Sequence, residues 1–590
     1  MASPVKTPGV DTPNVGPYVA AIWDSRPRKF NNVLLQVTLF ILIMELAERL
    51  SYYGINQGLK NFMKVRIGWT NVSASALKST WTSICYMSPL FGAYLADERW
   101  GRYRTIMVFG VWYCVGDFLV AIAAHPDVYA HRSTAEVIFV IGLYLGIAIG
   151  TGAIKSNVIT FGADQFDPRD PKELKLKDTY FSYFYFCINF GAAFSYGYLS
   201  YLCVNGSSLI PKDYGYFATY LICACMMFFA FLSFIIGTKR YVFVEPSDNS
   251  ISTLVRVIFN APSVHNKGAI LLGGTLLMFA SVFINTVGAF LVEKGKTGEY
   301  LSYTSAVAVF LGIVAWIIVG LDTSFIDGAK VSRGGKFADE AIDGYKKLFR
   351  CLPFAAFTII WHCAYDQTDA NFQSITQQCD LRWSRSADDN SQVPGAMLGV
   401  FDPVVIFGKA TAGLIVAAIG IIWAGIFEIM RRNSGQLERK DGSGPILDGG
   451  SELPMNKIYW AAAIPNYVFI ALAECLINVT AYDVFYSNVP MSLKSTAMAV
   501  NLLMSSMGAS LTSVFTIMFR PYLPSDDLNK GNLEYMYFTM GAVSIANLFA
   551  FSFIMNKMNF GMSSSADEDN EFLVNEKESV SSRKSFAGAN

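Results

Sequence analysis

Long apolar runs separated by short polar stretches cover most of this chain. Each run approaches or exceeds the roughly 20 residues that a helix needs to cross a bilayer. The runs lie at 33–55, 76–97, 104–124, 136–160, 179–204, 213–237, 268–292, 302–321, 350–376, 403–429, 456–482, 493–519 and 534–556. This pattern predicts an all-α membrane protein with many transmembrane helices.

The spacing of the runs divides the chain into two helix bundles. Six runs fall within 31–240, the N-terminal bundle, and the last five fall within 346–558, the C-terminal bundle. The region between them, 241–345, holds two apolar runs and a polar stretch, so we expect two extra helices there. The polar ends, 1–30 and 559–590, are predicted to be cytoplasmic tails, the second one disordered.

The helix count of the C-terminal bundle is open, because five runs are one short of six. Gly408-Lys409 predicts a turn that splits 394–429 into two short helices, which restores six and places the loop 433–455 outside. A single helix over 403–429 would instead place that loop in the cytoplasm. We favour the split.

Basic residues predict the orientation of the chain in the membrane. They cluster before the first run, after the second, after the fourth and after the sixth, whereas the loops 125–135 and 205–212 carry one each. Lysine and arginine are enriched in cytoplasmic loops. The N-terminus is therefore predicted to be cytoplasmic, and the even helix count that the split restores places the C-terminus there as well.

The first run carries three charges where lipid would favour none. Glu45, Glu48, Arg49, Tyr52 and Tyr53 follow the i, i+3, i+4, i+7, i+8 spacing of one helix face. Charges at membrane depth are costly, so such a group is by default a candidate functional site. An ion pair needs only one acid, and the spare carboxylate can change its protonation without unpairing the arginine.

Composition narrows the function classes. Hydrophobic residues make up 53% of the 590 residues and charged residues 16%, against about 25% in a soluble domain. The formal net charge of zero gives no indication of nucleic-acid binding. The ten cysteines have no metal-ligand spacing and the four histidines form no catalytic pattern. We therefore expect neither an enzyme nor a cofactor.

Four stretches of the first half and two of the second resemble a known family. The stretches are Glu45-x-x-Glu48-Arg49-x-x-Tyr52-Tyr53-Gly54; Gly92-Ala93-x-x-Ala96-Asp97 with Gly101-Arg102-Tyr103; Gly150-Thr151-Gly152-x-Ile154-Lys155 with Phe161-Gly162-x-Asp164-Gln165-Phe166; Phe184-Tyr185-x-x-Ile188-Asn189-x-Gly191; Arg350-x-x-Pro353; and Pro490-x-Ser492-x-Lys494-Ser495. In order and spacing they resemble the proton-coupled oligopeptide transporter family, within the major facilitator superfamily. The resemblance covers roughly 30–240 and 345–555.

The resemblance implies a major facilitator fold that imports di- and tripeptides with protons by alternating access of two bundles. It implies a monomer in a lipid bilayer, with the plasma membrane as the commonest location and vacuolar or other endomembranes as alternatives. Its partners would be a small peptide and protons.

Site roles follow from the same positions. Lys155 lies well inside the fourth run, and a buried lysine needs a partner or it gives up its proton. The first-helix acids are its expected partners, which makes Glu45, Glu48, Arg49 and Lys155 the proton-coupling group. The expected substrate-binding residues are Tyr52, Tyr53, Tyr86, Lys155, Tyr185, Asn189, Trp361, Asp366 and Glu474, and the expected gating residues are Asp97 and Arg102.

One departure from the family leaves the substrate open. Peptide transporters usually carry arginine two residues after Tyr52-Tyr53-Gly54, and this chain has Asn56. Lys155 is then the one cation expected for a substrate carboxylate, in a site that is acidic by charge count. The plant branch of the family, which moves other small nitrogenous metabolites, is the alternative. A sensor that has lost transport is disfavoured, since the acids and Lys155 are present.

Overall fold

The structure is a computed structural model, and it describes residues 30, 32–167, 169–244, 246, 250–383, 392–394, 397, 410–439, 443–487, 489 and 493–558. Residues 1–29 of the predicted N-terminal tail, the predicted tail 559–590 and the predicted turn at Gly408-Lys409 lie outside the described residues. The described chain is helical with isolated β-bridges in its loops, as the apolar runs predict.

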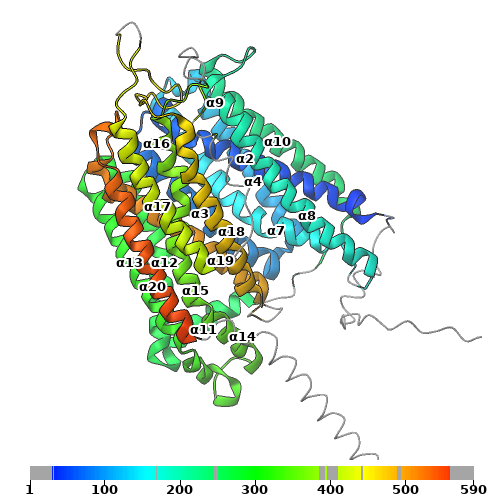
Figure 1. Cartoon of the computed structure of the whole chain (residues 1–590). Helices are drawn as coiled ribbons and strands as arrows, with labels where there is room; N and C mark the ends of the chain where they lie inside the picture. The colour runs from blue at the N-terminus through cyan, green and yellow to red at the C-terminus, as the bar shows by residue number, and fades with distance from the viewer. Residues whose placement is uncertain are drawn as a thin grey trace, which may run out of the picture.

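The helices of the first half follow the six predicted runs (Figure 1). They are η1 (Leu34–Thr38) with α2 (Leu39–Asn61), α3 (Asn71–Leu95), α4 (Arg102–Ala123), α6 (Arg132–Val140) with η4 (Ile141–Ala148) and α7 (Ile149–Ala163), α8 (Pro171–Phe194) with η5 (Ser195–Leu199) and α9 (Ser200–Asn205), and α10 (Gly215–Gly237). Several are extended by π-helical segments, so a single span consists of more than one labelled element.

The helices of the second half and of the interposed region also match predicted runs. The second half holds α15 (Leu352–Gln367), η11 (Thr368–Phe372), α16 (Gln373–Gln377), α17 (Ala410–Asn433), α18 (Ile464–Ser487), α19 (Lys494–Met518) and α20 (Glu534–Met558). The interposed region holds α11 (Ser250–Val264), α12 (Asn266–Leu291), α13 (Lys296–Leu321) and α14 (Asp339–Arg350).

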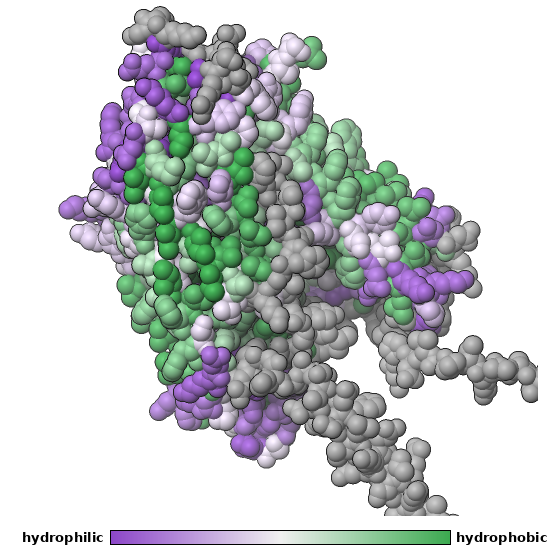
Figure 2. Space-filling model, in the orientation of Figure 1, coloured by the Kyte–Doolittle hydropathy of each residue, from purple (hydrophilic) through white to green (hydrophobic). Residues whose placement is uncertain are grey.

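Ten of the described helices are long and apolar enough to cross a membrane by length and composition. The helices α2, α3 and α8 fall outside this group because polar and charged side chains interrupt them. Figure 2 shows hydrophobic side chains around the middle of the second half and hydrophilic ones at its two ends. Side chains such as Phe549 and Phe553 on α20 are 71% exposed, as expected for a surface that faces lipid.

The two extra helices predicted between the bundles are present. The helices α12 and α13 form a hairpin that packs closely at Gly274 and Ala315, where an added Cβ on Gly274 would lie 2.4 Å from the Cβ of Ala315. This hairpin packs against α3, α15 and α19, and the side-chain amide of Asn285 donates to the carbonyl of Ser510 at 3.0 Å. It therefore packs on two helices of the second half and also contacts the first half through α3.

The structure bears on one part of the two alternatives for the C-terminal bundle, the position of the loop after residue 433. Residues 410–433 form one continuous helix, α17, yet the loop that follows it lies at the C-terminal end of α2, where Lys64 donates to the Ser451 carbonyl at 2.9 Å. This is the face on which the favoured split places the loop, while the predicted turn at Gly408-Lys409 and the first of the two short helices lie outside the described residues. The helices α15–α16 and α17 both end at this face, so they run in the same direction through the fold (Figure 1).

The hydrogen bonds between the two halves gather at this same face. They come from residues 56–83, in α2, α3 and the segment that joins these helices, and reach α15, η11, α16, α19 and the loops after α17 and α19. We call this region the closed face.

A labelling experiment tests the placement of the loop after α17. Ser443 is exposed in this loop, and a Ser443→Cys variant should react with an impermeant maleimide in intact cells if the closed face is extracellular. None of the ten native cysteines is exposed, so the background should be low. Ser332→Cys, in the exposed segment before α14, is the matched control and should react only after permeabilisation. The opposite labelling pattern would reverse the predicted orientation.

Candidate functional site

The centre of the site is the charged face of α2. The guanidinium of Arg49 contacts both acids: Nε lies 2.9 Å from Glu45 Oε1 and Nη2 lies 2.6 Å from Glu48 Oε2. The hydroxyl of Thr151 on α7 donates to the other oxygen of Glu48. Both carboxylates are buried, at 2% and 0% exposure. One arginine therefore faces two acids, as the helical spacing predicts.

Lys155 reaches the same region from α7, but its contacts differ from those expected. Its Nζ lies 3.6 Å from the centre of the Tyr52 ring and 4.6 Å from that of Tyr86, within the range of cation–π attraction. Among the described residues this buried Nζ has no hydrogen-bond partner. The expected ion pair between Lys155 and the acids of α2 is therefore absent from this conformation, because Arg49 takes both carboxylates.

Aromatic packing holds the rings around Lys155. Tyr52 stacks on Trp81 with ring centres 5.2 Å apart, and Tyr53 meets Tyr52 edge to face at 5.4 Å. Tyr53 also lies 5.7 Å from Tyr196. These contacts fix the face that Tyr52 turns toward the ammonium.

The two predicted residues of α8 are close to α2 but are not gathered around Lys155. Tyr185 is 51% exposed, and the side-chain amide of Asn189 donates to the Tyr185 carbonyl of its own helix at 2.8 Å. The helix itself lies against the site, since the position of Gly191 leaves only 3.0 Å between an added Cβ and the Cβ of Arg49. Their role as substrate contacts stays a prediction.

The acids of the second half occupy two different environments. Asp366 on α15 is buried and accepts a hydrogen bond from Ser79 of α3 at 2.6 Å. Glu474 on α18 accepts one from Asn478 at 3.1 Å, within its own helix. Trp361 is 1% exposed and packs beside Tyr365 with ring centres 5.8 Å apart. Their binding roles likewise stay predictions.

Two lysines that the sequence analysis missed join the halves at the closed face. Lys60 donates to the Ala370 carbonyl at 2.6 Å, and also to the hydroxyl of Ser374. Lys78 donates to the Asp369 carbonyl at 2.8 Å. Both lysines are 1% exposed. The available signal was a lysine inside or beside a predicted membrane run, which is costly unless it has partners.

Asn56 belongs to this interface, which corrects our interpretation of the missing arginine. Its side-chain amide donates to the Asp369 carboxylate at 2.7 Å, across the two halves. The charge count is also incomplete, because the buried Lys60 and Lys78 donate to the main-chain carbonyls of Ala370 and Asp369. The Asn56 side chain therefore forms a hydrogen bond across the closed face and is not placed to bind a substrate carboxylate in this conformation.

We predict that Asn56→Arg slows transport by strengthening the closed face. A guanidinium against Asp369 makes a charge-assisted contact stronger than an amide, and an added 1 kcal/mol or so shifts the conformational equilibrium roughly fivefold. Turnover at saturating substrate should fall by about that factor while substrate affinity is kept. Asn56→Gln is the control. An unchanged turnover with a new preference for free over amidated peptides would show instead that residue 56 contacts the substrate carboxylate.

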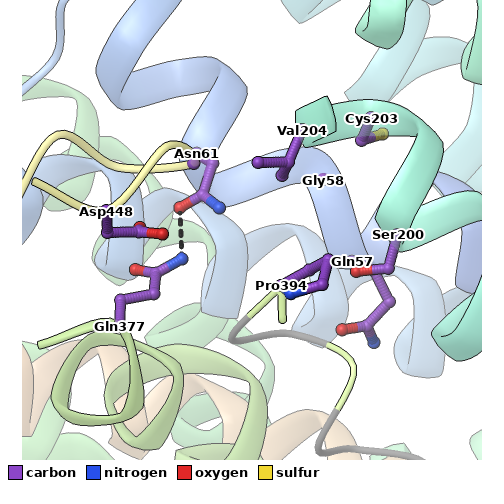
Figure 3. Close-up of a pocket in the computed structure, with 10 residues that line it drawn as sticks. Gln57, Gly58, Asn61, Ser200, Cys203, Val204, Gln377, Pro394 and Asp448 are labelled. Atoms are coloured by element: carbon purple, nitrogen blue, oxygen red, sulfur yellow. Dashed lines mark hydrogen bonds between the residues drawn. The ribbon is translucent and has the colours of Figure 1, made fainter. Parts of the chain in front are cut away.

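A small pocket at the closed face is separate from the charged cluster. It lies between α2, α9, α16 and the loop after α17 (Figure 3), where Gln377 donates to Asn61 at 2.9 Å. Asp448 lines it and accepts hydrogen bonds from the backbone and hydroxyl of Ser451, while burial raises the pKa of its carboxyl. These bonds fold the loop over the junction of the halves.

The predicted gating pair is formed at the other end of α3. Arg102 Nη2 lies 3.2 Å from Asp97 Oδ1, and its Nη1 contacts Asp164 at the end of α7. Burial raises the pKa of the Asp164 carboxyl, and the Arg102 charge opposes this. Glu98 accepts the backbone N–H of Ser252, which ties α11 to the same loop. The gating function of Asp97 and Arg102 stays a prediction.

The fold and the site together define a multi-pass membrane transporter. Two helical halves meet at one face through buried polar contacts, and charged and aromatic groups lie within the first half beside the second. Such a design, with ionisable groups inside the membrane, is typical of transporters whose site lies between two bundles.

Comparison with known proteins identifies the family. The sequence profile of the POT family matches residues 103–408, more than half of the chain, and the chain therefore belongs to this family. The protein NRT1/PTR family 8.3 of Arabidopsis thaliana is 28% identical over 580 residues, covering 87% of this chain and 90% of that protein. The peptide transporter PTR_C of Candidozyma auris is 25% identical, covering 80% and 76%.

Solved structures share the fold. A crystal structure of an auto-inhibited POT family peptide transporter superposes with a TM-score of 0.66 at 21% identity, covering 89% of this chain and 98% of that one. The POT family transporter PepTSo gives the same TM-score at 20% identity. The predicted family and the major facilitator fold are thus confirmed.

Proposed function

We propose that this POT family transporter is a proton-coupled symporter that imports di- and tripeptides by alternating access. The observation that carries the proposal is the group on α2 and α7: two acids on Arg49, and beside them a lysine ammonium with aromatic rings but no hydrogen-bond partner among the described residues. An ammonium in this state has donors available for an anion.

The proposed cycle couples these groups through protonation. When a proton binds Glu45 or Glu48, Arg49 keeps one carboxylate and the site loses one negative charge. A substrate carboxylate then binds Lys155 without competing with two acids. In this proposal Glu474 and Asp366 of the second half attract the amino terminus of the peptide. The closed face opens in the alternate state to admit substrate from outside.

Reconstitution tests the proposal. The full chain in proteoliposomes with an imposed inward proton gradient should accumulate dialanine and trialanine, and a protonophore should abolish the accumulation. Dialanine uptake that does not respond to the gradient would reject coupling. If neither peptide is taken up but another solute is, the assignment of di- and tripeptides as substrates is rejected.

A second candidate is transport of other small nitrogenous metabolites. It is supported by the similarity to plant NRT1/PTR proteins and by Asn56, which contacts Asp369 where peptide transporters usually carry arginine. A POT family transporter has been solved with 5-aminolevulinic acid, so solutes other than peptides fit members of this fold. Nitrate, amines and amino acids in the same liposome assay distinguish the candidates. We further propose a monomer with both termini cytoplasmic, in the plasma membrane or an endomembrane.

A further inference from the structure

A third acid lies inside the N-terminal bundle, behind the charged face of α2, and the proposed cycle does not use it. Asp117 is near the middle of α4 and is 0% exposed. Its Oδ2 accepts a hydrogen bond from Ser51 of α2 at 2.9 Å, and Ser51 is also fully buried. Its Oδ1 has no hydrogen-bond partner among the described residues.

The surroundings of Asp117 offer no compensating charge. The charged group that acts most strongly on it is Glu48, a like charge, and in the described part of the chain no lysine or arginine forms an ion pair with it. The other ionisable neighbours are Tyr113 and Cys114 on α4 and Cys223 on α10. Arg49 acts on the neighbouring Tyr113 but is held by its own two carboxylates.

Tight packing seals this position from lipid and water. Glycines allow α4 to contact η4 and α7 closely. A Cβ added to Gly146 would lie only 2.4 Å from the Cα of Gly116, and a Cβ added to Gly150 would lie 2.8 Å from the Cβ of Tyr113. Tyr113 and Asp117 are four residues apart on one face of α4. The carboxyl is thus enclosed by helices that approach as closely as their backbones allow.

These observations decide the form of the acid. An ionised carboxylate buried without a cation costs several kcal/mol, far more than the single hydroxyl hydrogen bond returns. The neutral acid avoids that cost, with the Ser51 hydroxyl donating to the carbonyl oxygen Oδ2 and the proton on Oδ1.

We propose that Asp117 is a second proton-binding site of the transporter, loaded in this conformation and separate from Glu45 and Glu48. It takes up a proton when the first half closes around it and releases the proton when the bundle rearranges and water reaches the carboxylate. The claim that this proton moves with substrate rests on the proposed symport. The claim that Asp117 binds a proton does not.

Infrared difference spectroscopy of the full-length protein tests proton binding without any substrate. Between acidic and alkaline buffer, the wild type should show a protonated carboxylic acid band that is absent from Asp117→Asn. Ser51→Ala keeps the acid but removes its hydrogen bond, and should shift this band to higher frequency. Asp178→Asn, which replaces an exposed acid in the N-terminal half of α8, is the control and should leave the band unchanged. An identical spectrum in Asp117→Asn, or no shift in Ser51→Ala, would overturn the proposal.

A transport measurement tests the coupling. Dialanine carries no net charge at neutral pH, so the charge moved per dialanine counts the protons. In Asp117→Asn this ratio should be lower by one than in the wild type. An equal ratio in both would show that the Asp117 proton is not transported. A wild type that moves dialanine without charge would reject the proposed symport instead, while the infrared result would still decide proton binding.

Discussion

The Glu48→Gln variant should lose concentrative uptake while it keeps substrate exchange. A pH difference of one unit supplies about 1.4 kcal/mol per proton, which supports roughly tenfold accumulation. Glutamine cannot carry this proton, but its oxygen can still accept from Thr151, and Glu45 remains on Arg49. Accumulation should therefore fall to the external concentration, and counterflow of labelled substrate should persist.

Proteoliposomes with imposed gradients measure both activities on one preparation. Glu340→Gln, which neutralises an exposed acid of α14, should retain wild-type accumulation. Full accumulation by Glu48→Gln would remove Glu48 from proton coupling and leave Glu45 and Asp117 as candidates. Loss of both uptake and counterflow would show instead that the carboxylate is needed to hold the site together.

The Lys155→Met variant should discriminate between peptides by their carboxyl end. Methionine keeps much of the side-chain volume beside Tyr52 and Tyr86 but removes the ammonium. A hydrogen bond to a charged group is worth about 1.5–3 kcal/mol, so affinity for free-acid dialanine should fall roughly 10- to 100-fold. Affinity for amidated dialanine, which lacks the carboxylate, should change by less than about threefold.

Competition binding on the purified protein provides this comparison. Lys172→Met, at the exposed start of α8, is the matched control and should leave both affinities unchanged. An equal loss for free and amidated peptides would mean that Lys155 supports the shape of the site rather than the substrate carboxylate. No loss for either would place the substrate elsewhere.

The parts that local sequence predicts well are those set by helical geometry. The face of α2 that carries Glu45, Glu48 and Arg49 follows from their spacing, and the structure joins all three by ion pairs. The thirteen apolar runs and the extra helical hairpin follow from hydropathy. Both inferences need only contacts within one helix or the solvent preference of a segment.

The parts that were missed depend on which helices meet. Nothing in the spacing of Asn56 indicates that it contacts Asp369, because the two are 313 residues apart and lie in different halves. Lys155 was paired with the acids by charge alone, whereas Arg49 on the same helix as those acids reaches them first. Asp117 has a signal in the sequence, because it is an acid within the apolar run 104–124. An acid at membrane depth is a candidate functional residue, as the acids of α2 are.

A plain count of the thirteen runs does not predict the direction of α17, whereas the favoured split at Gly408-Lys409 does. Counting assumes that each described helix reverses the direction of the previous one, whereas α15–α16 and α17 end at the same face. The intervening residues, 378–409, lie largely outside the described chain.

The lysine contacts of the closed face have a genetic consequence. The acceptors of Lys60 and Lys78 include the main-chain carbonyls of Ala370 and Asp369, in the π-helical turn η11. Every residue has a main-chain carbonyl oxygen. A substitution on η11 therefore does not remove the acceptors of these two hydrogen bonds. A screen for variants that open this face too readily should therefore recover substitutions at the two lysine codons far more often than at codon 370. Codon 369 differs, because the Asp369 carboxylate also accepts a hydrogen bond from Asn56.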